Sequence, residues 1–466
     1  MTPGFHPRIM LRLTRLLTLG LASIALIAPV ARSATYGSAP LPLPETYFPG
    51  LKTILEAAVK QSPRMIAKNA DNAAAEGNRI VLRSGQLPSV NGWAQYFPWD
   101  WQDRRDLPYT TITTKLNYNV TVTQPIYHWG ALQNNTRIGA LQLRMTQGQT
   151  ADGYRLLVQE IRSQFLSLIV KKATLAKAHL SRQMAEDNFA ASKVKLEKKV
   201  ISDADMFMPT FSCDQSQLME DRVSDDYENA KSVFAKLCGT PILSDDQIPN
   251  EIPDVSDPAP ALEPILHAYV SQPEPESFAL KSLGDQIAVE KLTYKNTDVR
   301  LRPNFNFVAG TSLDQQSYTT NIAQKYAVTD YFVGVQLNWA IFDGFAVSGA
   351  KASSLARRRQ LEQSYKSLSA DLVDAARSQY KQIGFSRRSM ELSNRLLNGS
   401  VGALREKKAD LSRGLASEID VNTFQIQLAD AQINAYVSRS DYLIKSSDFL
   451  STTMQDPALA NLPNKP

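Results

Sequence analysis

The sequence predicts an α+β fold in which one unit, a strand pair followed by long helices, occurs twice along the chain. Three observations predict it: landmarks that recur at a constant spacing, strands with alternating apolar and polar residues, and two long stretches without proline. About two long strands per copy are too few to close a barrel across lipid within one chain. We therefore expect a barrel that is shared among several chains.

The repeat becomes visible when Pro303 is placed on Pro88, which defines a constant offset between the two copies. The same offset aligns further landmarks without an insertion: Ile126 with Ile341, Leu196 with Leu411, Ser202 with Ser417, Asp205 with Asp420, and Tyr227 with Tyr442. Matches over so long a stretch favour an internal duplication over chance similarity.

Alternation predicts the strands. Leu116 to Val122 and Tyr331 to Trp339 place apolar residues at every second position, which is typical of a strand with one apolar face. All five Trp lie in the two strand regions, together with many of the Tyr and Phe. A β-sandwich core could also hold such aromatics, but girdles at the rims of a lipid-facing barrel explain their concentration better.

The helices follow from spacing and from proline. A first helix is expected at about 50–84 in one copy and 275–300 in the other. Beyond the strands, proline is missing between Pro125 and Pro209, and apolar residues step by three and four in both copies: Tyr154, Leu157, Ile161, Phe165, Leu168, and Leu361, Tyr365, Leu368, Leu372, Ala375. This spacing predicts two helices of roughly 70 residues, about 100 Å each. A rod-like coiled coil would suit them, but it leaves the aromatic strands unexplained.

Residues 1–33 are predicted to be a secretory signal peptide. Three Arg precede an apolar stretch, 16–30, and small residues surround the expected cleavage site after Ser33. A membrane anchor is the weaker alternative, because the apolar core is short and ends at Pro29. The segment carries four Arg and no acid, so the balance of 51 basic and 46 acidic residues becomes 47 and 46 without it. This near-neutral chain gives no support to a nucleic-acid partner.

Several classes of site find no support. Cys213 and Cys238 fall in one predicted helix, roughly 37 Å apart at 1.5 Å per residue, too far for a disulfide. The four His are scattered, and no phosphate loop or nucleophile motif stands out, so we expect no metal, no cofactor and no catalytic residues. After the signal no apolar stretch is long enough to span a bilayer as a helix, so entry into a membrane would require a closed barrel.

Composition divides the chain into segments. Proline clusters mark the arm and the connector between the two copies. The expected order is a signal peptide, 1–33; an extended N-terminal arm, 34–49; repeat 1, 50–238; a Pro-rich connector, 239–274; repeat 2, 275–455; and a flexible tail, 456–466.

Two motifs resemble those of the TolC-like outer-membrane efflux channel family, over about residues 50–455. At the strand-to-helix junctions, Gln124 to Gly130 and Trp339 to Phe345 resemble the family signature QPLFDGG. At the second hairpin turn, Gly414 to Val421 resembles the family's hairpin tip. The junction residues that match are Pro125, Gly130, Asp343 and Gly344.

This resemblance implies a homotrimer with a twelve-stranded β-barrel, four strands per protomer, continued by a long α-helical periplasmic barrel. It implies the passive exit duct of a tripartite efflux pump or a type I secretion system, located in the outer membrane with a large periplasmic part. The implied partners are outer-membrane lipid, a periplasmic adaptor (membrane fusion) protein and an inner-membrane RND or ABC transporter. A periplasmic coiled-coil adaptor or structural protein is the alternative.

The resemblance also assigns an entrance gate to the hairpin turns, at Asp420, Asp205, Thr423, Gly414 and Arg413. Three copies of Asp420 would form a negative ring that favours cations, although an acid at that helix start is also worth about 0.3–1 kcal/mol as a cap. Thr423 stands where the family often has a second acid, so we expect a weaker ring. Asp205 matches an acid that helps to hold the helices closed.

The first turn departs from the family pattern. Lys199 replaces the family glycine, and Pro209 enters the following helix early. We therefore expect an unconventional first tip and a kinked return helix.

Overall fold

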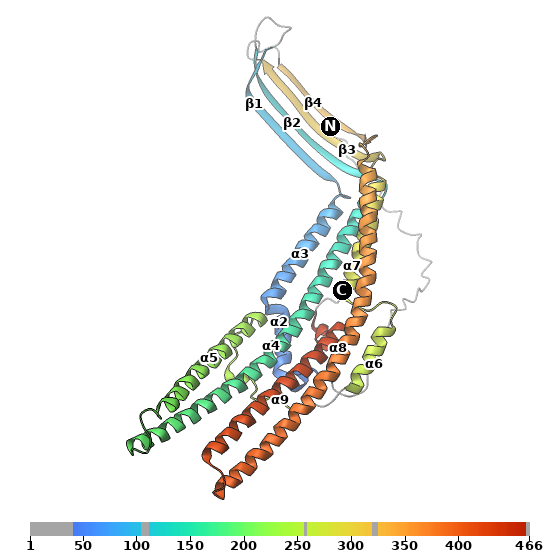
Figure 1. Cartoon of the computed structure of the whole chain (residues 1–466). Helices are drawn as coiled ribbons and strands as arrows, with labels where there is room; N and C mark the ends of the chain where they lie inside the picture. The colour runs from blue at the N-terminus through green and yellow to red at the C-terminus, as the bar shows by residue number, and fades with distance from the viewer. Residues whose placement is uncertain (1–40, 104–110, 256–258, 319–324, 463–466) are drawn as a thin grey trace, which may run out of the picture. The chain divides into compact units, whose positions relative to one another are not determined.

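The computed structural model describes residues 41–103, 111–255, 259–318 and 325–462, so the predicted signal peptide lies outside the described residues. Figure 1 shows two strand pairs, each followed by a long helix and a return helix. The elements in chain order are α1 (Pro44–Tyr47), α2 (Pro49–Gln61), α3 (Pro63–Ser84), β1 (Ser89–Gln102), β2 (Thr111–Tyr127), α4 (Ala131–Glu197), α5 (Phe207–Cys238), η1 (Asp245–Gln247), α6 (Ala259–Ser271), α7 (Phe278–Asp298), β3 (Asn304–Tyr318), β4 (Lys325–Asn338), α8 (Ala346–Ser412), α9 (Glu418–Thr452) and η2 (Pro457–Asn461).

The central part of the duplication is regular. α4 and α8 have 67 residues each, and the repeat offset that places Pro303 on Pro88 also places both ends of α8 on the ends of α4. The first residue of β3 falls on the first residue of β1 in the same way. The predicted α+β fold, with four strands in the chain and long helices after each pair, is confirmed. In the part of the chain that the structure describes, no helix combines the length and the apolar composition that crossing a membrane requires.

The four strands form one antiparallel sheet in the order β1-β2-β3-β4, so β2 and β3 join the two repeats and β1 and β4 are the edges. One row across the sheet runs from Trp93 to Asn119, Ser312 and Asp330. Bulges interrupt the pairing between Phe97 and Asp100 and next to Pro125. Because proline cannot donate to the ladder, a bulge at Pro125 is where the sheet tolerates it.

The two long helices differ in how completely they are covered. The apolar stripe predicted for α4, Tyr154 to Leu168, is at most 3% exposed at each of its five positions. α3, α5, α7 and α9 all pack against α4, whereas α8 packs against α6, α7 and α9. The stripe predicted for α8, Leu361 to Ala375, lies earlier in the repeat and is half-buried within one chain. Ala376 and Ile383, at the repeat positions of Ile161 and Leu168, are 0% and 3% exposed. Part of the apolar surface of α8 therefore remains available to another chain.

The N-terminal segment corrects two expectations. The first helix is not continuous over 50–84, because Pro63 starts a new helix after Ser62. The arm expected to be extended is wrong for residues 41–49, since Pro44 starts the short helix α1 and Pro49 starts α2. Proline is favoured at the first position of a helix, where no intrahelical bond from its nitrogen is needed. A Pro-rich segment can therefore be a series of helix starts.

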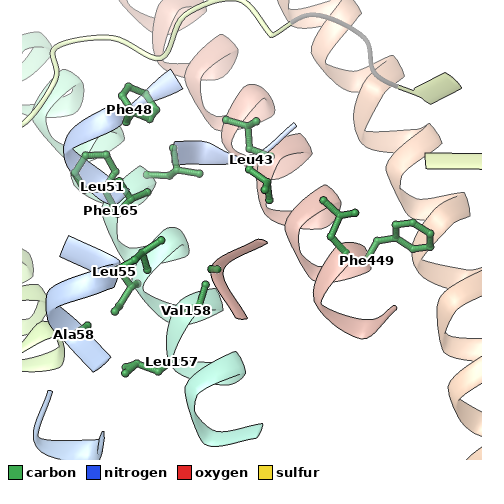
Figure 2. Close-up of a cluster of buried hydrophobic side chains, with 14 of the residues drawn as sticks. Leu43, Phe48, Leu51, Leu55, Ala58, Leu157, Val158, Phe165 and Phe449 are labelled. Atoms are coloured by element: carbon green, nitrogen blue, oxygen red, sulfur yellow. The ribbon is translucent and has the colours of Figure 1, made fainter. Parts of the chain in front are cut away.

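This segment forms part of the main hydrophobic core. Figure 2 shows Leu43, Phe48, Leu51 and Leu55 beside α4, where Phe48 and Phe165 have ring centroids 5.6 Å apart. The side chains of α2 that face α4 are at most 2% exposed at Leu51 and Leu55. Burial of each such Leu stabilises the fold by about 1.5–3 kcal/mol.

The connector between the repeats packs onto both hairpins. It contains a short helix, α6, and its Ile248 and Ile252 are buried. Lys172 of α4 donates to the carbonyl of Ile248 at 2.7 Å, and Arg439 of α9 donates to the carbonyl of Ile252 at 2.6 Å. The connector thus ties the middle of the first hairpin to the middle of the second.

A buried arginine joins the two ends of the described chain. Arg162 of α4 is 1% exposed and donates to Asp456 at 2.5 and 2.9 Å and to the hydroxyl of Ser447 at 2.6 Å. It also forms an ion pair with Glu45 of α1. Burial opposes the charge, but the hydrogen bonds and charges of Asp456 and Glu45 outweigh it and raise the pKa of Arg162.

The flexible tail expected at 456–466 is wrong for residues 456–462. Asp456 is 4% exposed and its carboxylate accepts a bond from the amide of Ala458 at 2.9 Å, which caps η2. Ala458 and Leu459 are buried in the same core as the N-terminal segment. The segment is held because its carboxylate neutralises Arg162.

We predict that Arg162→Met lowers the free energy of unfolding by about 3–5 kcal/mol, because it leaves the buried carboxylate of Asp456 without its cation. Arg377→Met is the matched control. It lies at the repeat-equivalent position of α8, where Arg377 pairs with Asp374 at 3.5 Å on the surface. We expect a change within about 0.5 kcal/mol for this control. Chemical denaturation of the purified protein in detergent measures both, and equal losses would contradict the assignment.

Candidate functional site

The second hairpin tip joins α8 to α9 through a tight turn. The amide of Leu415 donates to the carbonyl of Asp410 at 2.8 Å, and the amide of Gly414 donates to the carbonyl of Leu411 at 3.0 Å. This pair of bonds is a Schellman motif, which requires positive φ at its turning residue, and Gly414 has φ +75°. Gly414 and the preceding Arg413 are both exposed, at the end of the hairpin.

Asp420 forms a capping box with Ser417 at the start of α9. The amide and the hydroxyl of Ser417 donate to its carboxylate at 2.9 and 2.7 Å, and the amide of Asp420 donates to the Ser417 hydroxyl at 3.2 Å. The backbone and side-chain hydrogen bonds from Ser417 lower the pKa of Asp420, and the charge of Lys407 lowers it further. Asp420 is therefore ionised at neutral pH, and the same exposed carboxylate both caps the helix and places a negative charge at the tip.

Two neighbours define how much negative charge this tip carries. Thr423 is neutral and its hydroxyl donates to the carbonyl of Ile419 at 2.9 Å, within its own helix. Lys407, which sequence reasoning did not select, has its ammonium 3.5 Å from Asp410 and 5.8 Å from the ring centre of Phe424. Its sequence signal was weak, because it stands in a run of charged residues on α8. The charge of Lys407 therefore partly offsets the negative potential of Asp420 at this tip.

The first tip repeats the same turn with a lysine in place of glycine. The amide of Val200 donates to the carbonyl of Lys195 at 2.9 Å, and Lys199 has φ +57°. Asp205 accepts bonds from the amide and hydroxyl of Ser202 at 2.9 and 2.7 Å, and these bonds lower its pKa. The expectation of an unconventional first turn is therefore wrong for the turn itself, since the Schellman motif is present. Ser202 and Asp205 bond to each other as Ser417 and Asp420 do, but Met206, not Ser202, is the N-cap of α5.

Pro209 changes the start of the return helix. In the repeat alignment Asp203 corresponds to Glu418, the first residue of α9, but α5 starts only at Phe207. The intervening residues form a turn in which the amide of Met206 donates to the carbonyl of Asp203 at 3.2 Å. Pro209 lies in the first turn of α5, where a proline removes no helical bond, and α5 then runs unbroken to Cys238. The expected kink is replaced by a delayed helix start.

The delayed start leaves apolar side chains at the surface of the first tip. Phe207, Met208 and Phe211 are 66%, 63% and 50% exposed. The rings of Phe207 and Phe211 are stacked, with centroids 6.1 Å apart. Exposed apolar clusters of this kind indicate a contact with another protein.

The first strand-to-helix junction turns through two consecutive residues with positive φ, Trp129 at 54° and Gly130 at 83°. The Trp129 indole donates to the carbonyl of Pro303 at 2.8 Å, which anchors the turn to the second repeat. His128 shares a 2.8 Å hydrogen bond with Asn306 of β3, the residue opposite Pro125 in the sheet. Gly130 thus starts α4 at a fixed place beside the sheet.

The second junction has the same form with its glycine one position earlier in the repeat. Gly344 and Phe345 have φ of 64° and 66°, and the carboxylate of Asp343 accepts a bond from the amide of Val347 at 3.0 Å. The Trp339 indole donates to the carbonyl of Leu301 at 3.0 Å. The Trp side chains of both junctions therefore bind the same short segment before β3.

The cysteines offer no site chemistry. Cys213 and Cys238 both lie in α5 and both are free, as their spacing predicted. Burial raises the pKa of the Cys238 thiol to about 12, so it is protonated. Within the residues that the structure describes, no group of three His, Cys, Asp or Glu side chains is placed to bind one metal ion.

The sheet has two chemically different faces, because cross-strand partners point to the same side. We define the apolar face by the rows that contain Tyr96 and Leu116, Ala94 and Tyr118, and Val90 and Val122. The same rows continue across β3 and β4 with mostly apolar or uncharged residues: Phe307, Ala309, Thr311, Leu313, Gln315, Thr329, Tyr331, Val333, Val335 and Leu337. Trp101, opposite Ile112 beyond the bulge, also belongs to this face.

The opposite side, the polar face, carries every charged strand residue whose side chain the structure describes: Asp100, Lys115, Asp314 and Asp330. Lys115 and Asp100 form an ion pair at 2.5 Å. Three aromatic residues lie on this face too, since Phe97 is opposite Lys115, Trp93 is in the row of Asp330, and Phe332 is opposite Gly310. The aromatic residues of the sheet are therefore not confined to the apolar face.

Comparisons with solved structures identify the fold. The chain superimposes on the outer membrane channel CmeC of Campylobacter jejuni with a TM-score of 0.67 and 11% identity, over 87% of this chain and 85% of that one. It is similar to a membrane protein of Pseudomonas aeruginosa, with a TM-score of 0.64 and 15% identity over 92% and 99% of the two chains. The open state of the Neisseria gonorrhoeae MtrE outer membrane channel gives a TM-score of 0.64 and 10% identity over 91% and 95%.

These likenesses extend over nearly the whole described chain, so the long helices and the four-stranded sheet are one known architecture. No protein-family model matches the sequence, and no curated protein matches it either. The fold is thus shared with outer membrane channels at sequence identities of 10 and 11%.

We predict that Lys199→Gly raises the free energy of unfolding by about 1 kcal/mol, because it removes the strain of a side chain at positive φ. Gly414→Ala should lower it by a similar amount. A Cβ at Gly414 would meet no atom within 4 Å, so this control tests backbone strain alone. Urea denaturation measures both variants, and a destabilised Lys199→Gly protein would show that the lysine side chain has a structural role of its own.

Proposed function

We propose that this chain is one protomer of a trimeric outer-membrane channel, the passive exit duct of a tripartite efflux pump or a type I secretion system. The observation that carries the proposal is the sheet, whose two faces differ in charge and whose edges, β1 and β4, belong to one chain of four strands. A flat sheet of four strands cannot enclose a pore. Three copies, with β4 of each paired to β1 of the next, close a barrel of twelve strands.

The distribution of charge supports this closure. A face whose described side chains carry no charge suits the acyl chains of a bilayer, and a face with acids and amides suits a water-filled interior. The apolar stripe of α8 is half-buried, and Phe385 and Leu392 of the same helix are exposed. In a trimer, helices of a neighbouring protomer would cover this surface. The helices then continue the pore into the periplasm, as in the channels that share the fold.

The two hairpin tips of each chain are proposed to form the periplasmic entrance. Asp420 and Asp205 supply its charges, Gly414 and Arg413 shape its turn, and Thr423 adds no acid at its own position. The junction residues Pro125, Gly130, Asp343 and Gly344 are proposed to set the angle at which the strands of the barrel pass into the helices. In this arrangement the channel has no catalytic residues and no cofactor.

The partners follow from the same arrangement. A periplasmic adaptor and an inner-membrane RND or ABC transporter supply substrate and energy, and outer-membrane lipid surrounds the apolar face. The exposed Phe207, Met208 and Phe211 of the first tip suit an apolar contact with the adaptor. We propose the segments given by the sequence as its domains, with repeat 1 at 50–238, the connector at 239–274 and repeat 2 at 275–455.

The alternative, a periplasmic adaptor or structural rod, requires a water-soluble sheet. It leaves the uncharged face and its exposed Val333 and Val335 in water, at 73% and 66% exposure. The comparisons give this alternative no support, since the solved structures that match are described as outer membrane channels or membrane proteins.

We predict that the mature protein fractionates with outer membranes and that detergent extracts it as a trimer. The reason is that the apolar face of the closed barrel requires lipid or detergent around it. Density separation of membranes followed by native mass spectrometry tests this. Release by high salt alone would contradict the proposal and favour the adaptor.

We predict that Asp420→Asn lowers the cation selectivity of the channel in planar bilayers. Asparagine keeps an oxygen that accepts the bonds of Ser417, so the cap remains while the charge is lost. In the unmodified channel the lowered pKa keeps the charge as the pH falls, and selectivity is lost only when the pH passes below the pKa of folded Asp420. Asp205→Asn is the matched variant in the first tip, and unchanged selectivity in Asp420→Asn would reduce Asp420 to a helix cap.

A further inference from the structure

The polar face of the sheet carries aromatic rings that its polarity does not explain. Trp93 and Phe97 are 52% and 45% exposed, on rows otherwise formed by Asn119, Ser312, Lys115 and similar residues. Aromatic residues on the apolar face are accounted for by lipid. On the inner side of a water-filled barrel they expose apolar area to solvent, which is unfavourable unless something binds there.

One of these rings is held in place by a glycine. A Cβ built on Gly310 would lie 2.8 Å from the ring of Phe332 and 2.4 Å from the carbonyl oxygen of Val120. Only glycine at this position lets the Phe332 ring lie along the sheet, over β3. The Phe332 ring therefore lies over Gly310 on the polar face and is 38% exposed.

The charges beside the rings are negative in sum. Lys115 and Asp100 neutralise each other at 2.5 Å, which leaves Asp314 and Asp330 as the net charge of this face. With its amide turned so that the nitrogen donates, Asn117 lies 3.0 Å from the carboxylate of Asp314 on the same face. Asp330 is exposed and shares its row with Trp93. Three copies would give six such carboxylates around one pore.

We propose that the polar face of the barrel is a weak binding surface for amphipathic organic cations, with Trp93, Phe97 and Phe332 contacting the apolar part and Asp314 and Asp330 attracting the charge. This inference rests on the proposed function and names the class of substrate for the same pore. Aromatic rings attract organic cations through their faces, and carboxylates exclude organic anions of the same shape. Weak binding at many places lets a solute enter and still leave.

The test is block of single-channel current by small probes in planar bilayers. Benzyltrimethylammonium has a ring and a positive charge, tetramethylammonium has the charge alone, and benzenesulfonate has the ring with a negative charge. We expect benzyltrimethylammonium to block at lower concentration than the other two. Trp93→Leu should raise its half-blocking concentration about two- to fivefold, the loss expected for an exposed cation–π contact. Asp330→Asn should raise it for both cations.

Trp101→Leu is the matched control, because Trp101 lies on β1 but on the apolar face. Benzyltrimethylammonium should block this variant at the same concentration as the unmodified channel. Each variant is first shown to be a trimer, so that altered block is not altered folding. Equal block by benzenesulfonate, or unchanged block in Trp93→Leu, would overturn the inference. Block by maltohexaose that is the same in Asp330→Asn as in the unmodified channel would also overturn it, because this result would indicate a sugar-binding surface. An unmodified protein that forms no channels would overturn the proposed function, and this inference with it.

Discussion

The architecture depends on one buried ion-pair network, centred on Arg162. This side chain is 1% exposed, so its charge is stable only where carboxylates surround it, and those carboxylates come from α1 and from the segment before η2. The network therefore fixes both ends of the described chain against the middle of α4. The repeat-equivalent Arg377 pairs with Asp374 at the surface. The two long helices are therefore similar in length, but the buried ion-pair network forms at the first of them.

Local patterns predicted most of the fold. The constant offset between the repeats located α4 and α8, and the acid expected to act as a cap at the start of the second return helix, Asp420, does so. Lys199 and Pro209 were misjudged for a physical reason. A lysine can take positive φ at a modest cost in strain, and a proline in the first turn of a helix removes no hydrogen bond.

The features that could not be predicted depend on distant partners. Arg162 stands among apolar residues of an amphipathic helix, and nothing local shows that Glu45 and Asp456 will meet it. The faces of β1 were obscured by the bulge between Phe97 and Asp100, which shifts the alternation of a strand rich in aromatics. Only the pairing register with β2 shows that Trp93 and Trp101 lie on opposite faces of the sheet. The charge of Lys407 on Asp420 likewise depends on how α8 and α9 pack together.

The edge strands have a consequence for the life of the chain before assembly. β1 and β4 are 14 residues each and form the edges of the sheet, and long edges of this kind pair readily with any other strand. Such edges make a single chain prone to aggregate before it is assembled. In the proposed trimer, closing the barrel is the same event as finding two further copies, so the apparent stability of the sheet would rise with the concentration of newly exported chains.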